Sequence, residues 1–429
     1  MNLDHIVEES NMSVNFWNAN AKTSRLRLLI IIAKVTALAA VLLMLTQTCK
    51  SSPHCFTPFV KSPASRPVIA SGVAGVPTFI SDPCVIKDET GYHAFFSVYY
   101  LKNKAEGKHW FSYDPANPDD YDLGDSMGGI GYAFSADQGL TWTCRQTPLV
   151  TTGPEEWQTH SVETANVIKL DGRLLMFYSA QGHRNGKRFT ARYQIGVASV
   201  DLGEKSVEEK LLDESVVFLK RKTPLIPFRL DKPHHDNNTQ EPSVLLKDGN
   251  IELFYIGLGL SKPSEAIEKG NAIMNMAMYK AVFDTDLNLV SHSEDPLLEG
   301  ANIIEVRYRD GVYHTFSTKS PPLLARLFAD FHKEETITHY LSKDGEDWTR
   351  EELILEGGPT GTFDGWGIMA PTVVFEKDHV VLFYTAWEYE DRSDLPESAL
   401  RRFGMGRKNG DAIHGTLGRA VARLKPEGS

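Results

Sequence analysis

Four carboxylates hold similar positions in the sequence. Asp82, Glu163, Glu241 and Glu305 each open a run of apolar residues, and an aromatic run follows after a turn. If the four runs are equivalent strands around one axis, the carboxylates gather at one end of it. Clustered like charges raise one another's pKa, so one group can stay protonated while another is ionised. The set therefore predicts general acid and base chemistry. The alternative is that some of these carboxylates only accept hydrogen bonds from nearby main-chain amides. This alternative is strongest for Glu305.

The carboxylates belong to a unit that is repeated five times. A run rich in Val, Ile, Phe and Tyr, typical of strands, is followed by a hairpin turn that is often Asp-Gly, and then by an aromatic run. A third run follows in most units. Outer strands are marked by a turn and a tryptophan at Trp142 and Trp348, which we expect to be packing residues. The pattern predicts an all-β fold, a five-bladed β-propeller. A β-sandwich is the alternative, but it does not explain five equivalent openings.

The N-terminal region has a different composition. Residues 28–48 form the long apolar stretch of the chain, and basic residues precede it. This pattern predicts a single-pass type II membrane protein whose C-terminal domain lies outside the cell or in a lumen. The predicted parts are a cytoplasmic tail (1–27), a signal anchor (28–48), a stalk (49–75) and the propeller (76–426). The alternative is a long signal peptide cleaved after residue 39, which would give a secreted protein.

Charge and cysteine content exclude several classes of partner. The formal net charge is -11, and no basic run alternates with aromatic residues, so we expect no nucleic-acid partner. No protein partner is predicted. The four cysteines have no metal-ligand spacing, and a disulfide between Cys84 and Cys144 is left open.

The opening motifs resemble those of a known enzyme family. Asp82-Pro83 with its apolar run, and Glu241-Pro242-Ser243 two units later, are similar to glycoside hydrolase family 43, and more distantly to the fructan-hydrolysing family 32. The resemblance covers nearly the whole predicted propeller. It implies an inverting mechanism with Asp82 as general base, Glu241 as general acid and Glu163 tuning the pKa of the acid. The second unit departs from the family, because Glu163 stands where an Asp is usual and no proline follows it.

Several further residues are candidates for contact with a sugar. His160 and His235 precede the openings of the second and third units, and Trp366 precedes the fifth. Glu305 is a further candidate. Arg307 alternates with Glu305, so we expect it on the same face, where it pairs with Glu305 or contacts an acidic sugar.

No firm metal site or cofactor is predicted. His414 resembles a channel histidine that some family members place near a central ion, so a structural Ca²⁺ there stays open, although too few oxygen ligands can be assigned to it.

Together these features predict a glycoside hydrolase that acts on an oligo- or polysaccharide. The resemblance favours arabinofuranosides, xylosides or related sugars as substrates. Two alternatives stay open. One is a carbohydrate-binding propeller without catalysis. The other is a retaining, fructosidase-like enzyme in which Asp82 is the nucleophile.

Overall fold

A computed structural model describes the part of the chain discussed below. The described residues are 56–70, 80–103, 109–110, 121–182, 193–228, 238–260, 274–319, 335–349, 352–391 and 411–425. The predicted cytoplasmic tail and signal anchor lie outside them, as does His235. Among the described residues, no helix is both long and apolar enough to cross a bilayer. One compact unit extends from Pro58 to Leu424.

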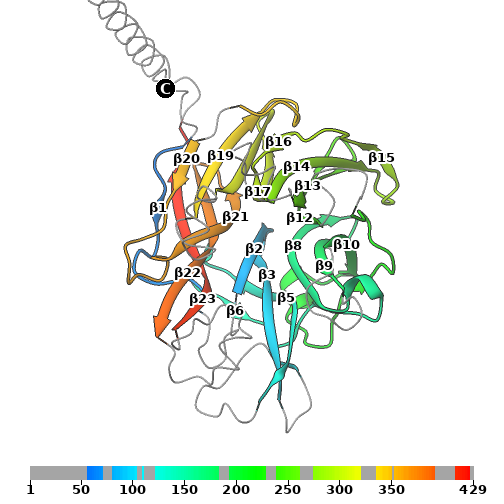
Figure 1. Cartoon of the computed structure of the whole chain (residues 1–429), viewed down its shortest axis with the longest axis horizontal. Helices are drawn as coiled ribbons and strands as arrows, with labels where there is room; N and C mark the ends of the chain where they lie inside the picture. Colours follow the sequence, from blue (N-terminus) through cyan, green and yellow to red (C-terminus); the bar gives the residue numbers. More distant parts are fainter. Residues whose placement is uncertain are drawn as a thin grey trace, which may run out of the picture. The chain divides into compact units, whose positions relative to one another are not determined.

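This unit is built from five antiparallel sheets, or blades, and the inner strands β2, β8, β12, β17 and β21 lie nearest its centre (Figure 1). Blade 1 contains β2 (Ile80–Lys87), β3 (Tyr92–Asn103), β5 (Tyr121–Ser135) and β6 (Thr143–Cys144), with β4 (His109–Trp110) and β7 (Val150–Thr151) alongside. Blade 2 contains β8 (Ser161–Leu170), β9 (Arg173–Gln181), β10 (Gln194–Asp201) and β11 (Leu219–Lys220). Blade 3 contains β12 (Asn238–Lys247), β13 (Asn250–Leu260), β14 (Met274–Phe283), β15 (Leu289–His292) and β16 (Leu298–Glu299). Blade 4 contains β17 (Asn302–Arg309), β18 (Val312–Lys319), β19 (Thr336–Ser342) and β20 (Glu352–Leu355). Blade 5 contains β21 (Gly367–Phe375), β22 (His379–Asp391), β23 (Asp411–Arg423) and β1 (Val60–Lys61). The predicted five-bladed propeller is confirmed.

The Asp-Gly turns between inner strands and second strands form as the sequence predicts. Asp171-Gly172, Asp248-Gly249 and Asp310-Gly311 have positive φ at both residues. This is the conformation of the two-residue hairpin whose twist matches that of the strands, and Asp and Gly tolerate it best.

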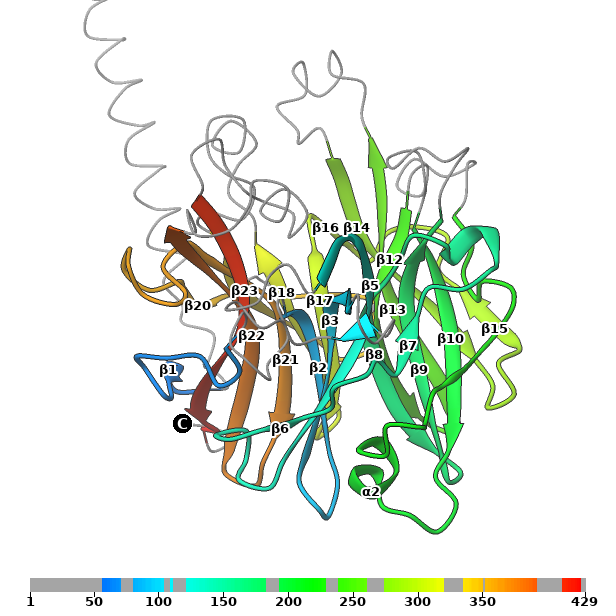
Figure 2. The same cartoon turned by 90° about the horizontal axis from the view of Figure 1, so that it is seen from below.

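The N-terminal strand closes the propeller. Strand β1 pairs with β23, with Val60 opposite Val421, and Figure 2 shows the two strands side by side. Arg419 also ties the two together, because its guanidinium donates to the carbonyl oxygen of Ser62 at 3.1 Å. The propeller therefore begins at Pro58, within the segment that was predicted to be a stalk.

Every inner strand carries a bulge at the same level. One residue in each has a positive φ, between 41° and 57°. These bulge residues are Asp82, Thr164, Glu241, Ile303 and Ala370. The strand pairing shifts at each of them. Such bulges turn the chain locally and re-aim side chains. The third residue after each bulge residue is a fully buried valine: Val85, Val167, Val244, Val306 and Val373.

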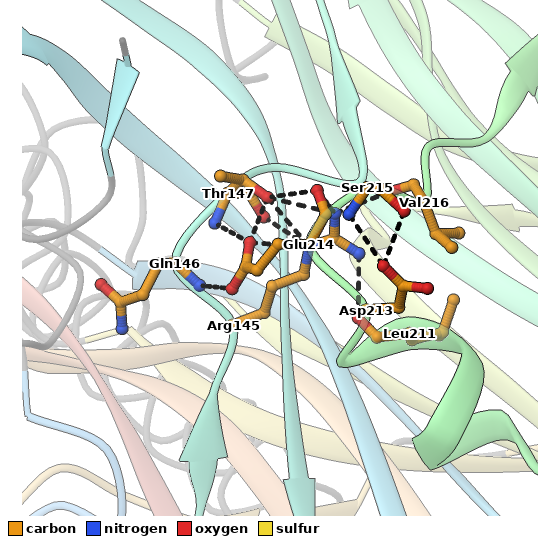
Figure 3. Close-up of polar contacts among 8 residues, drawn as sticks. All are labelled: Arg145, Gln146, Thr147, Leu211, Asp213, Glu214, Ser215 and Val216. Carbon is orange, nitrogen blue, oxygen red and sulfur yellow. Dashed lines mark hydrogen bonds and ion pairs between the residues drawn. The ribbon is translucent and has the colours of Figure 1, made fainter. Parts of the chain in front are cut away.

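The apolar core lies between the blades, and one buried arginine joins blades 1 and 2. Arg145, 1% exposed, follows β6 and donates to the main-chain oxygens of Leu211, Glu214 and Val216, at 2.9, 3.0 and 2.6 Å (Figure 3). In return the carboxylate of Glu214 accepts from the main-chain N–H of Thr147 at 2.9 Å. The short helix α2 (Val207–Leu211), with a capping box from Ser206, brings these carbonyls to Arg145.

The two predicted outer-strand tryptophans are packing residues. Trp142 packs edge-on against Phe383 of blade 5, and Trp348 packs edge-on against Phe254 of blade 3. Both therefore fill space between blades, as predicted. Cys84 and Cys144 are both free, so the disulfide left open by the sequence does not form.

Candidate active site

The bulges bring two of the predicted carboxylates to one pocket. Asp82 of blade 1 and Glu241 of blade 3 are both bulge residues, and both line a small pocket at one end of the central channel. Thr164, Ile303 and Ala370, the other three bulge residues, line the same pocket. Each of the two carboxylates is 8% exposed. A non-glycine residue with positive φ is costly, and such residues gather at functional sites.

The main chain of four bulge residues is fixed by a hydroxyl of the neighbouring blade. The N–H of Asp82 donates to Thr385 Oγ1 at 2.9 Å, and that of Glu241 donates to Ser179 Oγ at 2.8 Å. Thr164 and Ala370 make the same bond to Ser97 and Thr318. These bonds hold the carboxylates through the backbone, so their positions follow from the packing of whole blades.

Glu241 is held by two donors and is strongly perturbed. Its Oε2 accepts from the main-chain N–H of Ile303 at 2.7 Å, and its Oε1 accepts from Gln240 Nε2 at 2.8 Å. The pKa of Glu241 is raised to about 8, mainly by burial; the charges of Asp82 and Glu163 also raise it, and the two donors lower it. A carboxyl with this pKa carries a proton at neutral pH, which is what a general acid requires.

Asp82 is held by the residue that precedes it. Ser81 donates from Oγ to Asp82 Oδ2 at 2.8 Å. Gln240 makes the corresponding bond to Glu241 in blade 3. Each of the two carboxylates is thus fixed by its own strand as well as by the neighbouring blade.

Glu163 lies close to the pair but not at the equivalent position. The bulge residue of blade 2 is Thr164, so Glu163 stands one residue earlier, where blades 1 and 3 have Ser81 and Gln240. Glu163 is partly buried, and its Oε1 accepts from Ser161 Oγ at 2.9 Å and from the hydroxyl of Tyr193. Burial raises the pKa of Glu163, and the charge of Asp82 adds to this, while Tyr193 and Ser161 oppose it.

Glu305 lies deeper in the channel than its place in the repeat predicts. It stands two residues after the bulge residue Ile303. The residues that stand two positions after each bulge residue form a ring, which we call the channel ring: Cys84, Asn166, Ser243, Glu305 and Thr372. Glu305 is 2% exposed and accepts from Asn166 Nδ2 at 2.8 Å and Thr372 Oγ1 at 3.2 Å. Glu305 lines the same pocket as Asp82 and Glu241. It stands two residues after the bulge residue, however, so the predicted equivalence of its position with that of Asp82 is wrong.

Arg307 faces the other end of the channel. It pairs with Glu305, as one of the two predictions had it, and donates to the carbonyl oxygens of Val373 and Val85, each at 3.3 Å. It lines a second, wider pocket on the opposite side, together with Lys87, Arg309 and Glu376. Arg307 is absent from the lining of the pocket that holds Asp82 and Glu241. The structure therefore gives no support for contact between Arg307 and a sugar in that pocket.

Two of the predicted sugar-contacting residues lie near the carboxylate end. Trp366 is half-buried and packs against a buried cluster that includes Ala370, which lines the pocket. His160, also half-buried, directly precedes β8, the strand of Glu163. The side chain of His414 lies outside the described ones. Among the described residues, no group of three or more His, Cys, Asp or Glu is arranged to hold a metal ion.

Three residues of the site, Tyr193, Asn166 and Ile303, were not predicted from the sequence. Each acts on a carboxylate far away in the sequence, so local patterns do not reveal it. The repeated valine was the available signal for the register: aligning Val85, Val167 and Val244 puts Asp82, Thr164 and Glu241 at one level.

Comparison with known proteins identifies solved structures that share this fold. No protein-family model and no curated protein matches the sequence. Solved structures do match. A BT0996 complex with RGII has a TM-score of 0.57 at 13% identity, over 86% of this chain and 93% of that one. Zg3597, a family 117 glycoside hydrolase from the marine bacterium Zobellia galactanivorans, has a TM-score of 0.52 at 14% identity, over 86% of this chain and 92% of that one. This chain shares the fold of these solved structures, one of which is a glycoside hydrolase, so the predicted resemblance to propeller glycosidases is confirmed at the level of the fold.

Proposed function

We propose that the protein is a glycoside hydrolase that inverts the anomeric carbon, with Glu241 as general acid and Asp82 as general base. One observation carries the proposal: the buried Glu241 carboxyl, whose pKa is raised to about 8, shares a pocket with a second carboxylate. Pairs of carboxyl groups whose environments separate their protonation states are the machinery of glycoside hydrolysis.

The chemistry follows from the two roles. Glu241 gives its proton to the glycosidic oxygen as the bond to the anomeric carbon breaks. Asp82 takes a proton from a water molecule that attacks this carbon from the opposite face. Inversion needs the two carboxyls about 6.5–9.5 Å apart, so that the water fits between them. Asp82 and Glu241 come from blades that are separated by blade 2, which supports such a gap. Glu163, whose charge raises the pKa of Glu241, helps to keep the acid protonated.

For the substrate we propose a neutral sugar of the arabinofuranoside or xyloside type. The resemblance of Asp82-Pro83 and Glu241-Pro242 to family 43 favours these sugars. Trp366 is half-buried and packs against the cluster that includes the pocket residue Ala370, so it offers an aromatic face near the pocket on which a sugar ring can stack.

The test is hydrolysis of a panel of aryl glycosides by the full chain. The panel includes arabinofuranoside, xyloside, galactofuranoside, galactoside and fructoside, and the variants are Asp82→Asn and Glu241→Gln. The matched control is Glu299→Gln, because Glu299 is an exposed glutamate of the same blade as Glu241. Turnover of one member that both site variants lose and the control keeps would support the proposal. NMR of the first product would show an inverted anomeric configuration.

Other outcomes separate the alternatives. A retained configuration would assign Asp82 as a nucleophile and the protein as a retaining enzyme. Sugar binding without turnover, unchanged in Asp82→Asn and Glu241→Gln, would identify a carbohydrate-binding propeller.

We also propose that residues 28–48 anchor the protein in a membrane with the propeller on the far side from the N-terminus. The support is the basic residues before this apolar stretch. Sequencing the N-terminus of the mature protein tests this, since a start near residue 40 would show cleavage and secretion.

A further inference from the structure

Tyr193 touches the carboxylate cluster from outside the inner strands. It directly precedes β10, the third strand of blade 2, and its hydroxyl donates to Glu163 Oε1. Ser161 donates to the same oxygen at 2.9 Å. Two O–H donors on one carboxylate oxygen favour its ionised form and fix its direction.

The main chain of Tyr193 is tied to the strand that carries the proposed acid. Its N–H donates to Asn238 Oδ1 at 2.8 Å, and its carbonyl oxygen accepts from the N–H of Thr239 at 3.0 Å. Asn238 and Thr239 open β12, which carries Glu241. Tyr193 therefore connects Glu163 of blade 2 to the Glu241 strand of blade 3, because its hydroxyl bonds Glu163 and its main chain bonds Asn238 and Thr239.

We propose that Tyr193 is a positioning residue, whose hydroxyl fixes Glu163 between Asp82 and Glu241 and, through Glu163, keeps the Glu241 carboxyl in its acid form. The proposal rests on the proposed function. The groups that act on Glu163 are Asp82 from blade 1, Ser161 from its own strand and Tyr193; the charge of Glu163 acts in turn on Glu241.

The sign of the effect can be worked out. Burial and Asp82 raise the pKa of Glu163, and the Tyr193 hydroxyl lowers it. Without the hydroxyl, Glu163 takes up a proton more readily. Its negative charge, which raises the pKa of Glu241, is then partly lost. Glu241 therefore gives up its proton at a lower pH, and the two groups titrate as a coupled pair.

The experiment compares Tyr193→Phe with the wild type in the full chain. Phenylalanine keeps the ring and both main-chain bonds, so the melting temperature should stay close to that of the wild type. The alkaline limb of the pH profile of kcat/KM should move down by about one pH unit, a roughly tenfold loss of activity above that limb. Tyr308→Phe is the matched control, because Tyr308 lies 42% exposed at the other end of the channel.

A second measurement does not depend on activity. The side-chain carboxyl carbons of glutamate are labelled with ¹³C and titrated by NMR, and the Glu241 signal is the one that Glu241→Gln loses. A lower pKa of this signal in folded Tyr193→Phe supports the inference even if no glycoside is hydrolysed, in which case only the proposed function falls. An unchanged Glu241 titration, or an unchanged alkaline limb in an active enzyme, overturns it. Asn238→Ala removes one of the two main-chain bonds of Tyr193 and leaves its hydroxyl, so a shift in Asn238→Ala without one in Tyr193→Phe would also overturn it.

Discussion

The carboxyl group of Glu241 accepts a hydrogen bond from the main-chain N–H of Ile303 in the next blade, at 2.7 Å. At the four other junctions of this kind a Ser or Thr hydroxyl takes the place of the carboxylate. In blade 3 the residue opposite Gln240, where that hydroxyl would stand, is Ile256. The proposed acid therefore also makes a bond that elsewhere serves only to join blades.

Introducing at position 256 the hydroxyl that blade 3 lacks should raise the pKa of Glu241. In Ile256→Thr we expect the new hydroxyl to accept from the Ile303 N–H, as its counterparts do. Glu241 then loses a donor that lowers its pKa, so its pKa rises above about 8 and the alkaline limb of kcat/KM moves up. The ¹³C titration of Glu241 checks this. A limb that moves down would contradict it, and Ile256→Val controls for the lost volume.

The acid role of Glu241 predicts a dependence on the leaving group. Glu241→Gln should lose about 10²- to 10⁴-fold in kcat/KM on an alkyl glycoside, whose leaving oxygen needs a proton. The loss should be much smaller for a dinitrophenyl glycoside, whose leaving group departs as an anion. Parallel kinetics on the two substrates measure the difference. Equal losses on both would remove Glu241 from the acid role.

We expect Glu305 and Arg307 to stabilise the channel ring only when both are present. Arg307→Met leaves the Glu305 carboxyl, 2% exposed, without its cation, and should cost about 3–5 kcal/mol of unfolding free energy. Glu305→Gln together with Arg307→Met should recover most of this, because the amide can still bond Asn166 and Thr372. Urea unfolding of the two single variants and the double variant gives the coupling energy. A double variant less stable than Arg307→Met would refute the pairing.

Two stacked histidines in blade 4 should make the protein sensitive to acid. His314 Nδ1 and His339 Nε2 lie 3.1 Å apart. Burial lowers the pKa of His314 to about 4 and that of His339 to about 3. Below pH 6.5 the unfolded chain binds protons at these two histidines that the folded chain does not bind. The unfolding free energy should thus fall by up to about 1.4 kcal/mol per pH unit for each histidine, from pH 6.5 down to about 4.

The variant His339→Gln checks this slope. Urea unfolding between pH 4.5 and 7.5 should show a shallower fall than in the wild type, with His379→Gln as the control, since His379 lies at the start of β22 beside Asp378. The same slope in His339→Gln and wild type would contradict the assignment.

The fold could be predicted from the sequence because its signals are local. Asp171-Gly172 and Asp248-Gly249 set hairpins, and the apolar runs around them set strands. The level of each inner strand in the channel could not be predicted in the same way. It depends on which residue adopts positive φ, and the bulge residues share no side-chain type.

The two proposed catalytic residues and the two other carboxylates illustrate this difference. Asp82 and Glu241 coincide with bulges and were placed correctly at one level, whereas Glu163 is one residue early and Glu305 two residues late. Strand β1 was missed because it has only two residues and pairs across the whole chain.

The pairing of Val60 with Val421 has a consequence for synthesis. A ribosome makes the first strand of the propeller long before its partner exists. Closing a loop of this length costs entropy that is recovered only when the last strand arrives. The growing chain must therefore carry an unpaired N-terminal edge through the formation of four blades, and the first strand to be made is among the last to be paired.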